Sequence, residues 1–360
     1  MYDIAIIGAG PAGATLARLI GTSYKVLLVD KRELAEVPED ISSGKCCGGL
    51  LAPDAQKMLS TLGLGLPKSV LEEPQLFVVK AIDIEQGLER YYQRHYINMN
   101  RQKFDSWLVS LVPSGVDIRT RCRFQSYAPE SNAFKITLVQ DNKSYAEKAK
   151  IVVGADGASS QVRRQSLFRH LPPQQYFAIQ EWDEGDNNFP YFTSLFDREI
   201  TDYYCWTIPK GDYLIIGGAF HHTQRASEKF KLLKKKIRHY GFEFGKTVRT
   251  EGAVILRPMK TQQLSTGAKG IALLGEAGGW ISPSSAEGIS YALRSALVLA
   301  EALLKASDGF EKRYDEKMRA LRRNIWLKNL KSYFIFNQKL RKTVMKSGLQ
   351  SMKIHTMKRD

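Results

Sequence analysis

The chain opens with short apolar runs separated by amphipathic segments, a pattern that predicts a parallel sheet covered by helices. The run Tyr2–Ile7 predicts a buried strand, Pro11–Leu19 a helix and Tyr24–Val29 a second strand. This order of elements is typical of a doubly wound α/β unit. The same pattern returns near the end, with a strand at Gly270–Leu274 and a long helix at Ala286–Lys305.

The middle of the chain follows a different pattern, in which aromatic and polar positions alternate with the period of two expected for strands. Such runs occur at Leu76–Ile84 and Tyr91–Asn98, and again from about residue 175 to 256. The second region includes a strand predicted at Tyr203–Ile208 and one interrupting helix at Ala226–Tyr240. We therefore expect a second domain built on an antiparallel sheet.

Composition narrows the class of protein. The chain has 360 residues, of which 43% are hydrophobic and 25% charged, which excludes a disordered or collagen-like chain. It has no run of about 18 apolar residues that would span a membrane, and its start lacks the pattern of a signal peptide. The four cysteines show no C-x-x-C spacing and the six histidines are scattered. We expect a cytoplasmic protein without a metal site.

The net charge of +16 is concentrated at the C-terminus, where residues 311–360 hold 15 Lys and Arg against 4 Asp and Glu. Four aromatic residues alternate there with cations: Trp326, Tyr333, Phe334 and Phe336 among Lys328, Lys331, Lys339, Arg341 and Lys342. A basic helix with aromatic residues suits the surface of an anionic membrane. The alternative is a solvated face packed on the body of the protein. We expect no nucleic-acid partner, because no nucleic-acid-binding motif accompanies the charge.

A glycine-rich turn follows the first strand and carries the first chemical signature. Gly8, Gly10 and Gly13 form the pattern G-x-G-x-x-G at the start of a helix. In this context the glycines allow a tight turn, close approach of a pyrophosphate and close packing of helix on strand. Asp30 ends the second strand, where its carboxylate would accept hydrogen bonds from a ribose. The cofactor-binding candidates here are Gly8, Gly10, Pro11, Ala12, Gly13, Asp30 and Lys31.

A second signature, G-A-D-G-x-x-S-x-V-R, runs from Gly154 to Arg163 after an apolar strand. Here the chain resembles the single-dinucleotide-domain flavoproteins, the superfamily of aromatic hydroxylases and geranylgeranyl reductases. The resemblance implies that Asp156 and Gly157 lie near the pyrophosphate of FAD. It also implies that Arg101, in an R-x-x-F-D pattern, contacts the cofactor.

The third signature of that superfamily is normally G-D-A, with an aspartate that binds the ribityl chain of the flavin. This chain has Gly275 and Glu276 in those positions, followed by Pro283 and by Gly288 and Ile289, which begin the long helix. Glutamate is one methylene longer than aspartate, so the resemblance implies a similar contact from a more distant backbone.

Two further motifs resemble those of geranylgeranyl reductases. Lys45, Cys46, Cys47, Gly48 and Gly49 match a K-x-C-G-G loop that runs along the flavin in that family. The run 203–210, YYCWTIPK, resembles a Y-x-W-x-F-P motif that lines a lipid pocket, with glycines downstream. This implies Tyr204, Trp206, Pro209 and Gly217 as pocket residues. The segment 44–59 is closest to the CbrA branch of the family, which also carries G-E-A in the third signature.

Cys47 is the candidate catalytic residue. Its thiol lies among glycines and beside Lys45, a cation that favours the thiolate. Cys47 would donate a proton to a substrate carbon or hold the flavin loop; the alternative is a small packing residue.

Together these patterns predict an α/β protein with a Rossmann-like FAD-binding domain, an antiparallel β-sheet substrate domain and a helical C-terminal tail. The predicted division assigns 1–75, 99–172 and 262–308 to the FAD-binding domain, 76–98 and 173–261 to the substrate domain, and 309–360 to the basic tail.

The predicted function is that of an FAD-dependent oxidoreductase in which hydride passes from flavin N5 to a carbon–carbon double bond of a prenyl or other lipid-like substrate. Only one dinucleotide fingerprint is present, so NAD(P)H or another electron carrier would dock transiently. The alternatives are a flavin-dependent monooxygenase or halogenase acting on an apolar substrate, and a non-catalytic flavin- or lipid-binding protein of the membrane surface.

Overall fold

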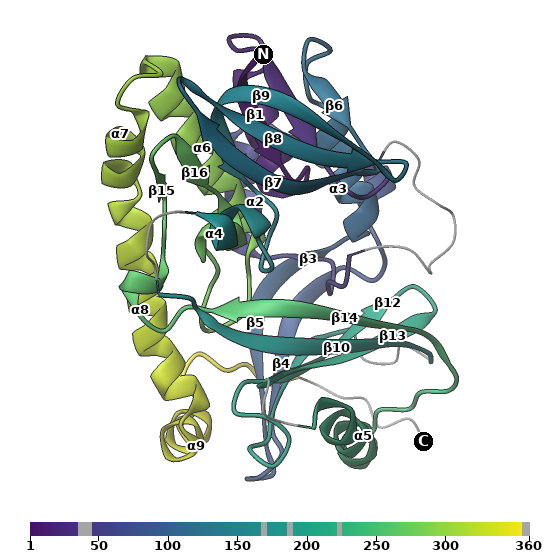
Figure 1. Ribbon diagram of the computed structural model, residues 1–360. Helices are drawn as coiled ribbons and strands as arrows, with labels where there is room; N and C mark the ends of the chain where they lie inside the picture. The colour runs from purple at the N-terminus through teal and green to yellow at the C-terminus, as the bar shows by residue number, and fades with distance from the viewer. Residues whose placement is uncertain (35–44, 167–170, 186–189, 222–224, 355–360) are drawn as a thin grey trace.

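The computed structural model describes residues 1–34, 45–166, 171–185, 190–221 and 225–354. It contains two eight-stranded sheets with the described helices packed around them (Figure 1). Gly44, at the start of the segment that resembles CbrA, lies outside the described residues.

The first sheet is the parallel sheet expected from the start of the chain. Its main path runs β15-β16-β9-β1-β2-β6, and β1 pairs in parallel with both β2 and β9. β9 is long enough to pair also with β8, which in turn pairs with β7. The strands are β1 (Tyr2–Ile7), β2 (Val26–Val29), β6 (Asp117–Arg119), β7 (Cys122–Glu130), β8 (Ala133–Gln140), β9 (Lys143–Gly154), β15 (Gly267–Ala268) and β16 (Ile271–Leu273).

Each face of the first sheet is covered by a different layer. Ile4 and Ile6 of β1 pack against a helical layer that includes Leu16 and Leu299, whereas Ala5 packs with the curled β7–β8 hairpin on the opposite face. Because successive side chains of β1 point to opposite faces, this one strand packs against both layers. The α-helices are α1 (Pro11–Ile20), α2 (Pro53–Thr61), α3 (Arg101–Ser110), α4 (Gln161–Gln165), α5 (Ala226–Ile237), α6 (Ile289–Lys305), α7 (Phe310–Lys317), α8 (Arg319–Phe336) and α9 (Gln338–Ser347).

The second sheet has the order β14-β10-β13-β12-β11-β4-β5-β3. It is antiparallel except that β4 and β11 pair in parallel. Its strands are β3 (Leu50–Leu51), β4 (Leu76–Asp83), β5 (Leu88–Asn98), β10 (Gln174–Glu184), β11 (Phe192–Phe196), β12 (Cys205–Lys210), β13 (Tyr213–His221) and β14 (Thr247–Arg257). The short 3₁₀ helices are η1 (Lys68–Val70), η2 (Arg238–Tyr240), η3 (Thr261–Gln263) and η4 (Gly275–Gly278).

One face of the second sheet packs on α5 through Phe230, Leu233 and Ile237. The opposite face carries Trp206, Ile208 and Ile215 and is turned toward the first sheet (Figure 1). The space between the two sheets is therefore bounded by the carboxyl ends of the parallel strands and by one face of the second sheet.

Among the predicted elements that begin later than expected, two border the space between the sheets. The long helix starts at Ile289 rather than Ala286, because residues 282–288 form a loop in which Ala286 adopts a φ of +49°. The strand predicted at Tyr203–Ile208 starts at Cys205. Tyr203 precedes it and donates no strand hydrogen bond; its hydroxyl accepts one from the N–H of Ala286 in that same loop.

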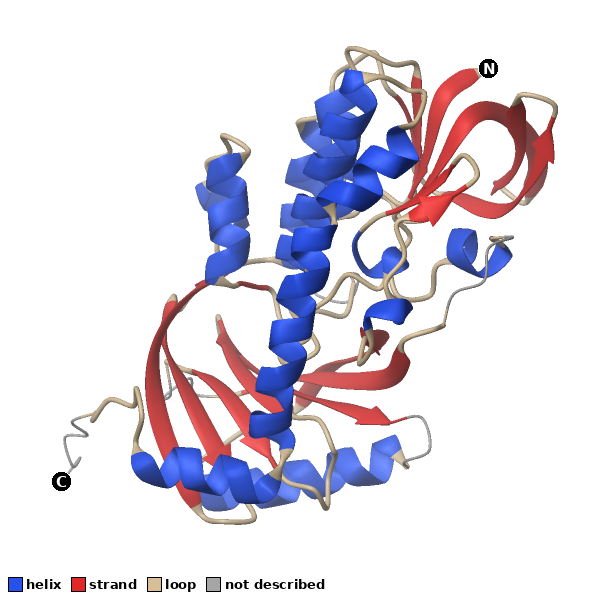
Figure 2. Ribbon diagram, turned by 90° about the vertical axis from the view of Figure 1, so that its left-hand side faces the viewer, coloured by secondary structure: helices blue, strands red, loops and turns tan. Residues whose placement is uncertain are grey.

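The C-terminal tail folds back onto the protein. α8 runs from the helical layer to the second sheet, and α9 lies against the outer part of that sheet (Figure 2). Phe336 packs beside Tyr203, and the guanidinium of Arg257 contacts both rings. Arg341 is buried and forms an ion pair with buried Asp83. Phe336 and Arg341 thus face inward, which corrects their inclusion among the membrane-facing residues of the tail.

Candidate cofactor and substrate site

A single cavity of about 1580 Å³ extends between the two sheets. It is larger than the roughly 300–1,000 Å³ of a site for a drug-sized ligand. Most of the residues singled out in the sequence line it: Gly8, Gly10, Pro11, Ala12, Asp30, Lys31, Lys45, Cys46, Cys47, Gly48, Gly49, Arg101, Asp156, Gly157, Tyr204, Trp206, Gly275, Glu276, Gly288 and Ile289.

The other four predicted site residues do not line the cavity. Gly13 lies behind the glycine turn, against the carbonyl of Gly8. The carbonyls of Pro209 and Pro283 accept hydrogen bonds from Asn98 and Arg257. Gly217 lies beneath Trp206, where a Cβ would fall 2.3 Å from the indole ring. Gly217 therefore seats a lining residue without lining the cavity itself.

The glycine turn fits a pyrophosphate. A Cβ on Gly13 would lie 1.8 Å from the carbonyl oxygen of Gly8, so only glycine allows α1 to begin this close to β1. A Cβ on Gly10, by contrast, would have no protein atom within 4 Å and would project into open space. The first turn of α1 thus presents free backbone N–H groups to the cavity, the arrangement that binds phosphate at a helix N-terminus.

Asp30 anchors a chain of ion pairs beside this turn. Its Oδ2 accepts a hydrogen bond of 2.8 Å from the N–H of Ala9, and Arg32 binds both of its oxygens. Arg32 also pairs with Asp105, which pairs with Arg101. Arg101 Nη1 in turn donates to the Sγ of Cys47 at 3.4 Å. This network connects the predicted ribose acceptor to the predicted catalytic thiol.

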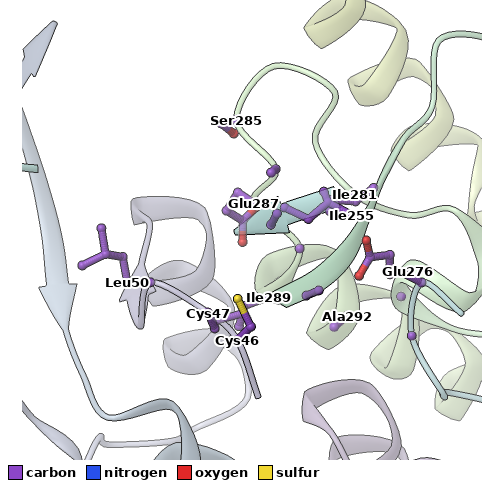
Figure 3. Close-up of a pocket in the computed structure, with 18 of the residues that line it drawn as sticks. Cys46, Cys47, Leu50, Ile255, Glu276, Ile281, Ser285, Glu287, Ile289 and Ala292 are labelled. Atoms are coloured by element: carbon purple, nitrogen blue, oxygen red, sulfur yellow. The ribbon is translucent and has the colours of Figure 1, made fainter. Parts of the chain in front are cut away.

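The environment of Cys47 favours its thiolate. Burial raises the pKa of this thiol, but Arg101 and the N–H of Gly49 outweigh burial and hold the pKa below its usual value. Cys46, its neighbour, has a pKa raised by burial to about 12. Figure 3 shows the two side chains on the segment that leads into Leu50, on the side facing Glu276. The two adjacent cysteines therefore differ sharply in acidity.

Lys210 holds the loop that carries Cys47. Its buried ammonium donates hydrogen bonds to the carbonyls of Gly48, Gly49 and Met99. Burial lowers the pKa of Lys210 to about 8. This clamp was not predicted, because a lysine at the end of a strand usually extends into solvent.

Asp156 has a polar atom available for a ligand. Its Oδ2 accepts hydrogen bonds from the N–H groups of Gln161 and Val162 at the start of α4. Its Oδ1 is buried and has no hydrogen-bond partner within the described ranges. Burial raises the pKa of Asp156. A buried oxygen without a partner costs about 1–3 kcal/mol, so a ligand donor at this position would be stabilising.

Glu276 connects the two sheets. Its Oε1 accepts a hydrogen bond of 2.9 Å from the N–H of Leu256 at the end of β14. Burial raises the pKa of Glu276, while Lys45 and Arg101 act in the opposite direction. The extra methylene relative to aspartate lets the side chain reach the second sheet (Figure 3). Glu276 is thus engaged with backbone on one side and faces the cavity on the other.

The second sheet supplies an aromatic wall. Trp206 Nε1 donates to Gln180 Oε1 at 3.3 Å, and the Tyr204 hydroxyl donates to the carbonyl of Ser285 at 2.8 Å. Gln180 also donates to Glu251 and to the carbonyl of Cys47. Gln180 lines the cavity and joins Trp206 to the Cys47 loop, a role that the sequence did not indicate.

The far end of the cavity is closed partly by the C-terminal helices and is lined mainly by apolar side chains, with Lys328, Lys331 and Arg341 among them. Phe192 and Phe196 of β11 line it together with Phe334, Ile335 and Met345 of α8 and α9. The cavity therefore combines a phosphate-binding end beside β1 and an apolar end beneath the tail. None of the helices described by the structure is long and apolar enough to cross a membrane.

Comparison with known proteins identifies the family. The family model for lycopene cyclase protein matches residues 3–354. The chain belongs to the lycopene cyclase protein family. It is 40% identical to protein CbrA of Escherichia coli K12 over 348 residues, which are 97% of this chain and 97% of CbrA. CbrA of Shigella sonnei is similar to the same degree.

Solved structures share the fold at lower sequence identity. A geranylgeranyl bacteriochlorophyll reductase-like protein of Thermoplasma acidophilum is 18% identical, with a TM-score of 0.81 over 99% of this chain and 94% of that one. PqsL of Pseudomonas aeruginosa, a probable FAD-dependent monooxygenase, is 18% identical, with a TM-score of 0.68 over 97% and 99%. These findings confirm the predicted family and α/β fold class, and place the chain among FAD-dependent oxidoreductases.

Proposed function

We propose that this protein is an FAD-dependent reductase of carbon–carbon double bonds in a prenyl or similar lipid. The observation that carries the proposal is the continuity of the cavity. One end has the glycine turn and the carboxylates that suit a dinucleotide, and the other end is walled by aromatic and aliphatic side chains. Such a cavity suits a flavin and an apolar chain placed end to end.

The residues present fit FAD. The N–H groups after Gly10 suit the pyrophosphate, Asp30 suits the adenosine ribose, and the unpartnered Oδ1 of Asp156 suits a donor group of the cofactor. The N-terminus of α6, at Gly288 and Ile289, borders the same cavity and favours negative charge there. When bound and reduced, FAD supplies the hydride that a carbon–carbon double bond would accept.

Reduction of a double bond also needs a proton, and Cys47 is placed to supply it. Arg101 and the N–H of Gly49 fix the Sγ, while Lys210 holds the loop. The proton would pass from the thiol to the second carbon, and water would return a proton to the thiolate. Only the protonated thiol can donate this proton, and the lowered pKa of Cys47 decreases the protonated fraction at a given pH. The alternative, in which Cys47 only holds the loop, predicts no such requirement.

The apolar end of the cavity sets the substrate class. Burial of each methylene contributes about 0.8 kcal/mol, so a long unbranched or prenyl chain would gain much of its affinity there. Tyr204 and Trp206 form one wall of this part, and Phe334 closes it from the tail. The net requirement is two electrons from an external donor, NAD(P)H or another carrier, which reduces the flavin before each turnover.

An anaerobic single-turnover experiment tests this function. The FAD-loaded protein is reduced, oxygen is excluded and a detergent-dispersed prenyl lipid is added. We expect the flavin absorbance to return to the oxidised form and the lipid to gain two hydrogen atoms per flavin. A reduced spectrum that persists with every prenyl lipid would contradict the proposal. Product containing an added oxygen or halogen atom in aerobic reactions would support the monooxygenase or halogenase alternative instead.

A further inference from the structure

The outer side of α8 carries an exposed apolar face beside the cavity. Five large side chains recur at helical spacing, and each is 48–65% exposed: Trp326, Leu327, Leu330, Tyr333 and Phe334, called here the docking face. Successive members of this set differ in residue number by one, three, three and one, a spacing that places them along one side of a helix. The opposite side of α8 is packed inward through Leu321, Ile325 and Ser332.

The docking face adjoins the entrance of the apolar end of the cavity. Leu330 and Phe334 belong to the docking face and also line the cavity. Two further exposed residues after them, Val344 and Leu349, line it as well. Figure 2 shows α8 as the long helix that crosses from the first sheet to the second, with its outer side free of other elements. Leu330 and Phe334 thus give a continuous apolar path from this surface to the cavity, with Lys328 and Lys331 of α8 beside it.

All the charged residues of α8 and α9 are basic. Residues 319–347, which form α8 and α9, contain nine Lys and Arg and no Asp or Glu. Arg323, Lys331, Lys339, Lys342 and Lys346 are exposed. An apolar helix face with Trp and Tyr, bordered by cations, is the composition of helices that lie in the interface of an anionic bilayer.

We propose that α8 docks on an anionic lipid bilayer through its docking face and opens the cavity toward the membrane. The proposal deepens the function proposed above and rests on it only for the entry of a lipid substrate. A second copy of the chain fits the surface less well. A symmetric dimer would set the same patch on both copies, so the cations of α8 and α9 would face each other without acidic partners on these helices.

Vesicle flotation with the full-length, FAD-loaded protein tests the docking. We expect the protein to float with phosphatidylcholine vesicles that contain phosphatidylglycerol, to stay behind with pure phosphatidylcholine, and to be released by high salt, which screens the attraction. The variant Trp326→Ser/Leu327→Ser/Tyr333→Ser should lose at least tenfold in vesicle partitioning. It leaves unchanged the two docking-face residues that line the cavity.

The matched control removes three exposed apolar side chains elsewhere, as Phe77→Ser/Phe177→Ser/Val248→Ser on the second sheet. This variant should float like the wild type. Equal flotation of the docking-face variant and the wild type would overturn the proposal, as would equal binding to neutral vesicles. A wild-type dimer that the docking-face substitutions convert to a monomer would assign the surface to a second copy instead.

A fluorescence measurement gives an independent readout. Brominated acyl chains in anionic vesicles should quench part of the tryptophan fluorescence of the wild type, and Trp326→Phe should abolish that part. Absence of quenching in the wild type would overturn the proposal. Neither vesicle experiment needs turnover, and the single-turnover experiment uses detergent-dispersed lipid, so failure of docking and failure of the reductase function are distinguishable.

Discussion

At the scale of single residues, the site is organised by buried charges that fix one thiol. Arg101 and Asp105 are buried beside Cys47, and Arg32 continues the network to Asp30. Arginine keeps its charge when buried and offers several donors in a fixed geometry. This arrangement lowers the pKa of Cys47 mainly through the charge of Arg101.

The proton-donor role of Cys47 predicts a falling alkaline limb in the pH profile of turnover. Turnover should decrease as pH rises through the lowered pKa of Cys47, because the thiolate has no proton to give. Arg101→Gln removes the main group that lowers this pKa, so the limb should move to higher pH. Cys46→Ala is the matched control and should leave the limb in place. An alkaline limb that does not respond to Arg101→Gln would exclude Cys47 as its origin.

Lys210 predicts a pH dependence of stability. Its pKa is about 8 in the folded protein and about 10.4 in an unfolded chain. Between these values the unfolded chain binds more protons, so the free energy of unfolding rises with pH. Relative to Lys210→Met, the wild type should gain about 3 kcal/mol across this window, at about 1.4 kcal/mol per pH unit. Urea titrations of both proteins measure this; parallel pH profiles would contradict the assigned pKa.

Local sequence patterns revealed some of these residues and not others. Gly8, Asp156 and Glu276 each follow a strand of the parallel sheet, so a local pattern places them at one sheet edge. Gln180 and Lys210 lie on strands of the second sheet and meet the Cys47 loop only through tertiary packing. Nothing in their neighbouring residues indicates those contacts.

At the scale of elements, the glycine turn joins β1 to α1. It leaves room for an added Cβ at Gly10 but not at Gly8 or Gly13. Gly10 and Gly13 therefore differ in what an added methyl group would meet. Gly10→Ala meets no protein atom, so the variant should fold with wild-type stability, while its methyl group occupies the open space and should lower FAD affinity at least tenfold. Gly115→Ala, which also meets no protein atom, is the control away from the site and should bind FAD normally.

Fluorescence titration with FAD and thermal unfolding of the apoproteins measure these two effects separately. Gly13→Ala, which forces a Cβ onto the carbonyl of Gly8, should lose both stability and FAD binding. Unchanged FAD affinity in Gly10→Ala would show that the cofactor does not approach this turn.

Element pairing was predicted less well than element type. The alternating pattern identified the strands of the second sheet, but β4 and β11 pair in parallel within it. The two strands are separated by more than a hundred residues, and alternation is the same in parallel and antiparallel strands. In the tail, the alternation of aromatic and basic residues did not show that Phe336 and Arg341 face the protein while Trp326 and Tyr333 face outward.

At the scale of the whole molecule, the tail closes the cavity because ion pairs and ring contacts fix it to the second sheet. Arg341 forms an ion pair with Asp83, which is fully buried. Removal of one partner leaves the other charge buried without compensation, which typically costs about 3–5 kcal/mol. The position of α9, and with it the far wall of the cavity, depends on this pair.

Arg341→Met should therefore lower the free energy of unfolding by about 3–5 kcal/mol, measured by urea denaturation. Asp83→Asn/Arg341→Met should recover most of the loss, because it removes both charges. The exposed pair of Lys317 and Glu301 is the matched control: Lys317→Met should cost less than about 1 kcal/mol. Equal losses in the two single variants would show that the buried pair does not fix the tail.

The central claim is that one cavity between the two sheets holds one flavin dinucleotide next to an apolar chamber. The most direct test is the molar ratio of FAD to protein after reconstitution and gel filtration of the full-length wild type. The account predicts one FAD per chain, with prenyl lipid perturbing the visible spectrum of the bound flavin. A colourless protein that retains no FAD under these conditions would contradict the account.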